Sequence, residues 1–286
     1  MAALQELVEQ ELDLPVDPRV SAMAAAIAGK YGPASRAVLF YGSCLRQSRL
    51  DGLMLDFYLI VSGYREAYGK GWLAAANRLV PPNVFYFEHD GLASKYAVLS
   101  LDDFHRLNGP ETRNVSVWAR FAQPARLVWA EPSARRRIIE SVARAAPTLL
   151  GAAGRVDGES PLDWWRRAFA LTYSAELRAE RKGKATSVVD MDAGRYANFT
   201  GPAVEAMAVN GTASSNWAAR RLQGKLLSVV RLAKASATFA GGADYIAWKI
   251  NRHAGTNIQL KPWQRRWPLL AAVTLLPRLL RSGAVR

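Results

Sequence analysis

The chain has 286 residues, of which 50% are hydrophobic and 22% are charged, values typical of a globular protein with ample core. A single cysteine, Cys44, excludes a disulfide framework and favours a reducing compartment. The formal net charge is +14, and residues 217–286 hold thirteen Lys and Arg against one acid, a net of +12. This concentration of charge predicts a phosphate-bearing partner, either a nucleic acid backbone or an anionic membrane surface.

The first part of the chain has the pattern of an α/β domain. Residues 1–13 are acidic and amphipathic, unlike a secretory signal or a transit peptide, and we expect a short helix of the folded protein. Apolar runs bounded by turn residues then alternate with helical periodicity. The predicted helices are 19–31, 65–79, 101–107 and 116–121, and the predicted strands are 37–41, 54–61, 83–88, 95–100 and 125–129.

After Pro132 the pattern becomes helical. The helices predicted there are 133–150, 162–181, 218–239 and 244–253. Ser133 is the expected N-cap of the first helix, and the spacing of Trp164 and Trp165 predicts that both face inward. No low-complexity linker is present, so we expect these helices to pack on the α/β part. The chain thus divides into an α/β domain, a helical domain and a basic C-terminal region, at 1–131, 132–216 and 217–286.

The most informative pattern lies where the first predicted strand ends. Tyr41, Gly42 and Ser43 follow its apolar run, and Asp56 lies inside the next one. A glycine lets the backbone approach phosphates, and a serine hydroxyl with nearby N–H groups can donate to phosphate oxygens. A carboxylate in a buried strand is costly unless it is paired or binds a metal such as Mg²⁺. This pattern is typical of nucleotidyltransferases, although an ordinary turn beside an ion-paired aspartate would have the same residues.

Several stretches beyond this pattern match one family in the right order. These stretches begin at Tyr41 and continue through residues 54–57, 91–100, 115–124 and 171–178. Together they resemble the mitochondrial phosphatidate cytidylyltransferases, also called translocator assembly and maintenance proteins, and their bacterial relatives. The resemblance covers residues 37–178, and a basic C-terminal region follows in both.

The resemblance implies a fold and an activity. The fold would be a nucleotidyltransferase domain with a mixed sheet, of class α/β or α+β, followed by a smaller helical or winged-helix-like domain and a basic helical tail. The activity would be Mg²⁺-dependent transfer from CTP to phosphatidate, yielding CDP-diacylglycerol and pyrophosphate. The protein would lie peripherally on the cytoplasmic face of a bacterial inner membrane, or on the matrix side of a mitochondrial one.

Individual roles follow from the same resemblance, position by position. Asp56 would bind Mg²⁺, and Lys95 would place positive charge at the phosphates, although a strand lysine that merely reaches solvent is the alternative for Lys95. The residues implied to bind the nucleotide are Tyr41, Gly42, Ser43, Arg120 and Arg178. For the two arginines of this set, a structural role stays open.

The sequence departs from the expected pattern at four positions, and at two of them, Ala119 and Ala175, an alanine replaces a glycine of the family. Cys44 follows the serine where the family has a glycine, and Tyr58 stands where the wider superfamily has a second acid. The second metal ligand is therefore open. Glu88, at the end of the third predicted strand, is our candidate, and Asp90 is the alternative.

The end of the chain has the composition of a membrane-surface segment. Its apolar run is about 14 residues, shorter than the ~20 that cross a bilayer, and Pro268 and Pro277 interrupt it. Tryptophans beside arginines and leucines suit the headgroup boundary. The residues expected to contact the membrane are Trp263, Arg265, Arg266, Trp267, Leu269 and Leu270. A helix docked on the protein core is the alternative, and nucleic acid binding is not expected.

Two other functions fit the same patterns. One is a nucleotidyltransferase acting on RNA or on a small molecule, which the basic tail would also suit. The other is a catalytically inactive, membrane-bound assembly factor, which the missing acid at Tyr58 favours.

Overall fold

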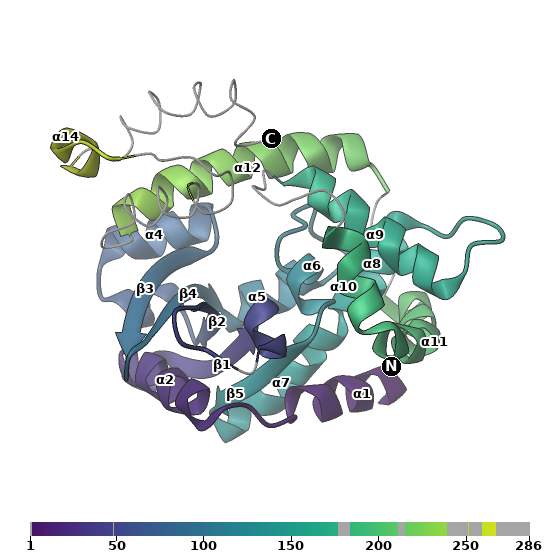
Figure 1. Ribbon diagram of the computed structural model, residues 1–286, viewed down its shortest axis with the longest axis horizontal. Helices are drawn as coiled ribbons and strands as arrows, with labels where there is room; N and C mark the ends of the chain where they lie inside the picture. The colour runs from purple at the N-terminus through teal and green to yellow at the C-terminus, as the bar shows by residue number, and fades with distance from the viewer. Residues whose placement is uncertain are drawn as a thin grey trace.

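The computed structural model describes residues 2–47, 49–176, 184–210, 215–238, 251 and 259–266. These residues form a mixed α/β structure, with a five-stranded mixed sheet and helices on both of its faces (Figure 1). The mixed α/β class expected from the sequence is therefore confirmed.

The sheet contains all five predicted strands. They are β1 (Ser35–Tyr41), β2 (Met54–Val61), β3 (Asn83–His89), β4 (Leu92–Ser100) and β5 (Ala125–Ala130). Their order is β3-β4-β2-β1-β5, in which β2 and β4 are parallel and the other neighbours are antiparallel. Strand β4 begins three residues before its predicted start, because Asp90 and Gly91 both adopt positive φ in a tight turn that pairs His89 with Leu92.

One face of the sheet is covered by α2 (Pro18–Gly29). Met23 and Ile27 of α2 are fully buried against side chains of this face, such as Val38 of β1 and Phe57 of β2. This face is apolar along its length, as expected for a sheet surface under a helix.

The opposite face is covered by most of the other helices. These are α1 (Ala2–Leu12), α5 (Leu101–Asn108), α6 (Trp118–Phe121), α7 (Pro132–Ala143), α8 (Ala145–Ala153), α9 (Pro161–Ala175), α10 (Lys184–Met191) and α11 (Ala193–Asn210). One continuous hydrophobic cluster joins them to the sheet and includes Trp164 and Trp165, whose inward orientation is confirmed. The described residues from 132 to 210 contain no strand, so they provide none for a winged helix.

Two predicted helices are each divided in two. The prediction 65–79 corresponds to α3 (Tyr64–Tyr68) and α4 (Gly71–Leu79), because Gly69 takes the left-handed conformation that ends a helix. The prediction 133–150 corresponds to α7 and α8, and Pro147, which has no N–H for a helix bond, lies in the first turn of α8. The Ser133 N-cap was wrong: α7 begins at Pro132, and Ser133 lies inside it.

The helix α12 (Trp217–Thr238) crosses from α9 to the start of β3 and runs along the top of Figure 1. It confirms the helix predicted at 218–239. A further short helix, α14 (Pro262–Arg266), lies near the C-terminal end of the described residues. The helix predicted at 244–253 lies, apart from Asn251, outside the described residues. Within the described part of the chain, no helix is both long and apolar enough to cross a bilayer.

Candidate functional site

Polar side chains gather at one end of the sheet face that lies opposite α2. Asp56 of β2 lies opposite Tyr41 on β1 and opposite Lys95 on β4, so all three share a face. The Lys95 Nζ lies 3.0 Å from the Asp56 Oδ1, and the two side chains are 25% and 20% exposed. The structure thus brings the predicted carboxylate and the predicted cation into direct contact, at a point that solvent reaches.

The Gly-Ser turn lies directly over this carboxylate. Gly42 has φ 93° and ψ −164°, a combination that is essentially restricted to glycine. A Cβ at this position would lie 3.3 Å from the Asp56 Oδ2. Ser43 begins the short 3₁₀ helix η2 (Ser43–Arg46), and burial raises the pKa of the Cys44 thiol inside it. Gly42 therefore lies in close contact with Asp56 of the neighbouring strand.

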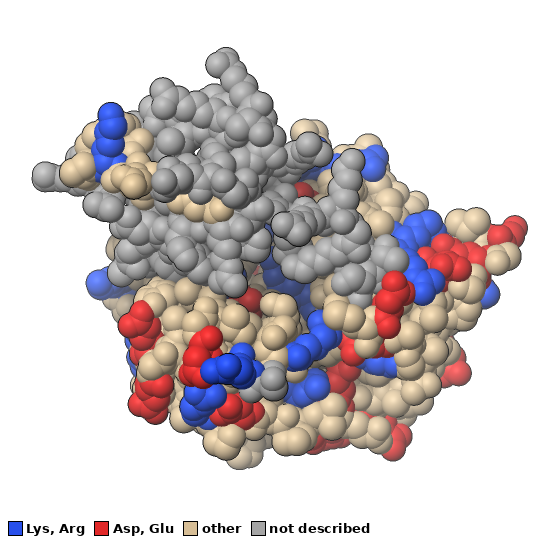
Figure 2. Space-filling view, viewed as in Figure 1, with Lys and Arg blue, Asp and Glu red and all other residues tan. Residues whose placement is uncertain are grey.

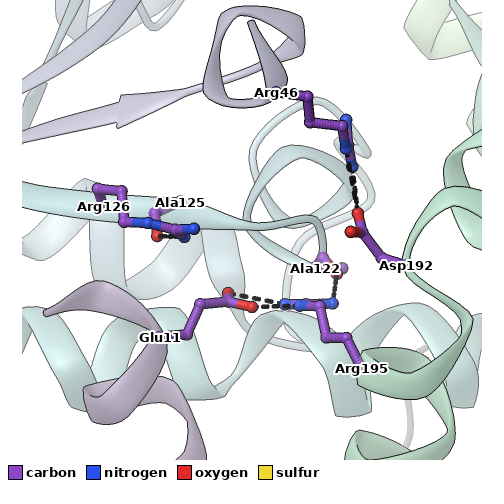
Figure 3. Close-up of polar contacts among 7 residues, drawn as sticks. All are labelled: Glu11, Arg46, Ala122, Ala125, Arg126, Asp192 and Arg195. Carbon is purple, nitrogen blue, oxygen red and sulfur yellow. Dashed lines mark hydrogen bonds and ion pairs between the residues drawn. The ribbon is translucent and has the colours of Figure 1, made fainter. Parts of the chain in front are cut away.

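The far end of the turn is tied to the helical part of the protein. The Arg46 guanidinium, at the end of η2, donates to the carboxylate of Asp192, between α10 and α11, at 2.5 Å. Nearby, Arg195 of α11 donates to the Glu11 carboxylate of α1 and to the Ala122 carbonyl oxygen, as Figure 3 shows. The end of the turn is therefore joined to the junction of α10 and α11, which α1 also contacts through Glu11.

Arg120 of α6 reaches the same end of the sheet. Its Nη1 contacts the Ser116 carbonyl oxygen and lies 3.9 Å from the Glu176 Oε1. Burial, and then the Asp56 carboxylate, raise the pKa of Tyr41 well above its ordinary value, while Arg120 acts in the opposite direction. Tyr41 is therefore a neutral hydroxyl placed between a carboxylate and a guanidinium.

The helix α12 contributes two more cations. The Arg231 Nε donates to the Pro81 carbonyl oxygen at 2.9 Å, and the Lys234 Nζ donates to the Pro82 carbonyl oxygen at 2.8 Å. Burial, and then the neighbouring Arg231, lower the pKa of Lys234 to about 7. Figure 2 shows basic side chains gathered near the middle of its view, where the surface is recessed.

Sequence reasoning did not assign Arg231 or Glu176 to the site. Glu176 was only part of a matched stretch, and Arg231 was only one basic residue of the C-terminal region. The available signal was the spacing of Arg220, Gly224 and Arg231, which places all three on one face of α12. The contacts of that face could not be read from spacing alone.

The candidate second metal ligands lie apart from Asp56. Glu88 is opposite Ala93 on β4, with its carboxylate against the Tyr86 hydroxyl, and β4 separates β3 from β2. Two strand spacings are about 10 Å, too far for Glu88 and Asp56 to share one ion. Asp90 lies in the β3–β4 turn, 3.4 Å from His89. Among the described residues, no three or more His, Cys, Asp or Glu are grouped as metal ligands.

The donors that are present fit a magnesium ion held mainly by substrate. Mg²⁺ is commonly bound by one or two carboxylates together with substrate phosphates and water. The Asp56 Oδ1 contacts Lys95, and the Oδ2 faces Gly42. Asp56 is the residue that would hold the ion.

Some of the residues predicted to contact the membrane or the nucleotide lie at or beyond the limits of the described residues. Trp263, in α14, is 43% exposed. The backbones of Arg265 and Arg266 belong to α14, and their side chains lie outside the description. The remaining predicted residues, Arg178, Trp267, Leu269 and Leu270, lie outside the described residues.

Comparison of the chain with models of known protein families and with curated proteins found no match.

Proposed function

We propose that this protein is a Mg²⁺-dependent nucleotidyltransferase that transfers CMP from CTP to phosphatidate at a membrane surface. The observation that carries the proposal is the position of Gly42 over Asp56, with Lys95 paired to the same carboxylate. That arrangement supports a triphosphate site in a nucleotidyltransferase fold. The choice of CTP and phosphatidate follows from the motif resemblance.

Each residue around Asp56 has a task in such a site. Gly42 leaves room for a phosphate where any side chain would meet Asp56, and the Ser43 hydroxyl can donate to a phosphate oxygen. Lys95 and Arg120 supply positive charge that offsets the repulsion between two polyanionic substrates. A bound Mg²⁺ would polarise the phosphates and favour the departure of pyrophosphate.

The reaction needs no strong general base. A phosphatidate oxygen is already anionic at neutral pH, so it attacks the α-phosphorus of CTP without losing a proton. The bond between the α-phosphorus and the bridging oxygen breaks, and pyrophosphate leaves with the electron pair. The work of the protein is to align two polyanions, which is the task that a cation-rich site performs.

The outward face of α12 supports contact with a lipid surface. Leu222 and Leu226 are 76% and 63% exposed, and Val229 lies on the same face. Arg221 and Lys225, between these apolar residues, are also exposed. Apolar residues interleaved with cations fit an anionic membrane, where each basic residue contributes about 1 kcal/mol.

The direct test is to incubate the purified protein with labelled CTP, Mg²⁺ and phosphatidate in detergent micelles. We expect a lipid-soluble cytidine product, and none with Asp56→Asn. A cytidine product on RNA or on a soluble acceptor instead would support a different nucleotidyltransferase. CTP binding without any product would support an inactive assembly factor.

The lipid contact has its own test. We expect the double variant Leu222→Ser, Leu226→Ser to bind phosphatidate-containing vesicles at least about tenfold more weakly than wild type, because two apolar side chains no longer insert. The matched control is Leu14→Ser, Leu79→Ser, which changes two exposed leucines elsewhere. Equal sedimentation of both double variants with vesicles would contradict the contact. Removal of residues 262–286 is also expected to abolish activity on liposomal phosphatidate.

A further inference from the structure

We propose that Arg231 and Arg120 form a phosphate-binding subsite on the sheet face that carries Tyr58 and Asp56. The ligand is a phosphate oxyanion, supplied either by the triphosphate of the nucleotide or by the phosphomonoester of the acceptor. The choice between these sources rests on the proposed function. The subsite itself does not, since inorganic phosphate can probe it.

The packing of α12 directs Arg231 toward the sheet. A Cβ at Gly224 would collide with the Ala175 carbonyl oxygen, so α12 lies directly against the end of α9. Arg231 follows Gly224 by about two turns on the same helix face. The Arg231 Nε donates to the Pro81 carbonyl oxygen, which fixes the guanidinium plane just before β3 begins. The side chain is therefore held in one place by contacts at both ends of the helix segment.

One donor of this fixed guanidinium is left unused. The Arg231 Nη2 is buried and has no hydrogen-bond partner in the described part of the protein. Leaving a buried charged donor unpaired is costly, and such groups in folded proteins usually have a ligand, an ion or water as partner. This unused donor is what points to a ligand.

The charges of Arg231 and Arg120 act on the same buried hydroxyl, that of Tyr58. Burial raises the pKa of Tyr58, and Arg120 and Arg231 both act to lower it. Burial also lowers the pKa of Arg231; Glu176 and Tyr58 oppose this effect and Arg120 adds to it. The effect of Arg120 on Arg231 is that of two positive charges that repel each other, and Tyr58, on which both act, is two residues after Asp56 on β2.

The charges around this point favour an anion. The guanidinium groups are those of Arg120 and Arg231, and the facing carboxylate is that of Glu176. A phosphate would supply acceptors to both guanidinium groups and relieve their repulsion. Arginine suits this ligand because its planar fork of donors matches two phosphate oxygens at once.

The first experiment measures inorganic phosphate binding to the full chain by calorimetry. We expect Arg231→Gln and Arg120→Gln each to weaken binding about tenfold or more, since a charged fork of donors is lost. The matched control is Arg221→Gln, which removes one exposed charge from the same helix and should change binding less than about twofold. If Arg231→Gln binds phosphate like the control, or if the wild type binds none, the subsite does not exist.

The second experiment identifies the source of the phosphate. Binding of Ca²⁺·CTP and of soluble dihexanoyl phosphatidate is measured separately for wild type, Arg231→Gln and Arg221→Gln. A loss of about tenfold on CTP alone assigns the subsite to the triphosphate, and the same loss on phosphatidate alone assigns it to the acceptor. Equal affinities of all three proteins for both ligands would overturn the assignment.

Further measurements distinguish loss of the subsite from misfolding and from failure of the proposed function. Arg231→Lys keeps the charge and a single donor nitrogen but not the planar fork, so we expect intermediate phosphate affinity at an unchanged melting temperature. Loss of phosphate affinity in Arg231→Gln without any cytidine transfer by wild type would support the subsite and reject the transferase. Normal phosphate affinity and normal KM values in Arg231→Gln, with active wild type, would reject only the subsite.

Discussion

Arg220 and Arg231 lie about three turns apart on the inward face of α12. Their guanidinium groups differ in whether the buried hydrogen-bond donors have partners. Arg220 is 2% exposed and donates to the carbonyl oxygens of Thr112 and Arg113, at 3.1 and 2.8 Å, beside the rings of two tryptophans that contact each other. Arg231 donates to one carbonyl oxygen and has a buried nitrogen without a partner. The first arginine completes a structure, whereas the second is positioned for a ligand.

The same contrast separates two regions of the molecule. In the helical part, Arg167 uses its donors on the Glu159 carboxylate and on two carbonyl oxygens, and Arg195 is satisfied by Glu11 and Ala122. On the sheet face that carries Asp56, Arg120 lies 3.9 Å from its acid, Glu176, and Arg231 has a buried nitrogen without a hydrogen-bond partner in the described part of the protein. The position of unmatched charge is thus a better guide to a site than the number of charges.

The largest expected effect is loss of activity without loss of fold. Asp56→Asn should reduce cytidine transfer by about 10³-fold or more, because the magnesium ligand and the partner of Lys95 are lost together. Its melting temperature should stay near that of wild type, since the carboxylate reaches solvent. Asp51→Asn, at an exposed acid near the turn, is the control. If stability and activity fall together in Asp56→Asn, the Asp56 carboxylate has a structural role instead.

Arg220→Met should have the reverse effect. Removing the guanidinium leaves the Thr112 and Arg113 carbonyl oxygens without their donor, so we expect a stability loss of about 2–4 kcal/mol. Transfer activity per folded molecule should be unchanged. Arg231→Met, by comparison, removes an incompletely satisfied buried charge and should cost less stability than Arg220→Met. Urea titration of both variants tests the contrast, and a larger loss for Arg231→Met would refute it.

Gly42→Ala tests the Gly-Ser turn, where we expect both stability and nucleotide binding to change. Its backbone conformation is strained for any residue with a Cβ, at a cost of about 1–3 kcal/mol, and the new methyl would press on the Asp56 carboxylate. We expect lower stability and at least about tenfold weaker binding of Mg²⁺·CTP. Gly52→Ala, at a positive-φ glycine with open space around it, is the matched control for backbone strain. If both variants bind CTP equally, the close approach to Asp56 has no functional role.

The smallest effect concerns pH. Burial, and then Arg144 and Arg137, lower the pKa of His105 from its ordinary 6.5 to about 4. The unfolded chain therefore binds the proton more readily, so His105 costs no stability above pH 6.5 and about 1–2 kcal/mol as the pH falls toward 4. His105→Gln should flatten the melting temperature in this window and leave the transfer rate unchanged. An unaltered slope between pH 6.5 and 4 would show that other groups cause it.

The predicted strands and the Gly42–Asp56 relation came from local patterns. Apolar runs ending at turn residues marked the strands, and a glycine before a serine marked the turn. The errors were also local: Gly69 divides one predicted helix, and the β3–β4 turn starts β4 earlier. Glu88 was proposed from its position at a strand end, and the intervening strand keeps it from Asp56.

The sequence by itself determined which segments become strands and helices, where the backbone needs a glycine, and that the positive charge is concentrated near the C-terminus. These properties depend on neighbouring residues, whose periodicity is visible in one dimension. Only the tertiary structure decided that Lys95 pairs with Asp56, that Arg46 reaches Asp192, and that Arg231 lies beside the same sheet face. Strand order and helix packing bring those residues together, and neither can be read from the spacing along the chain.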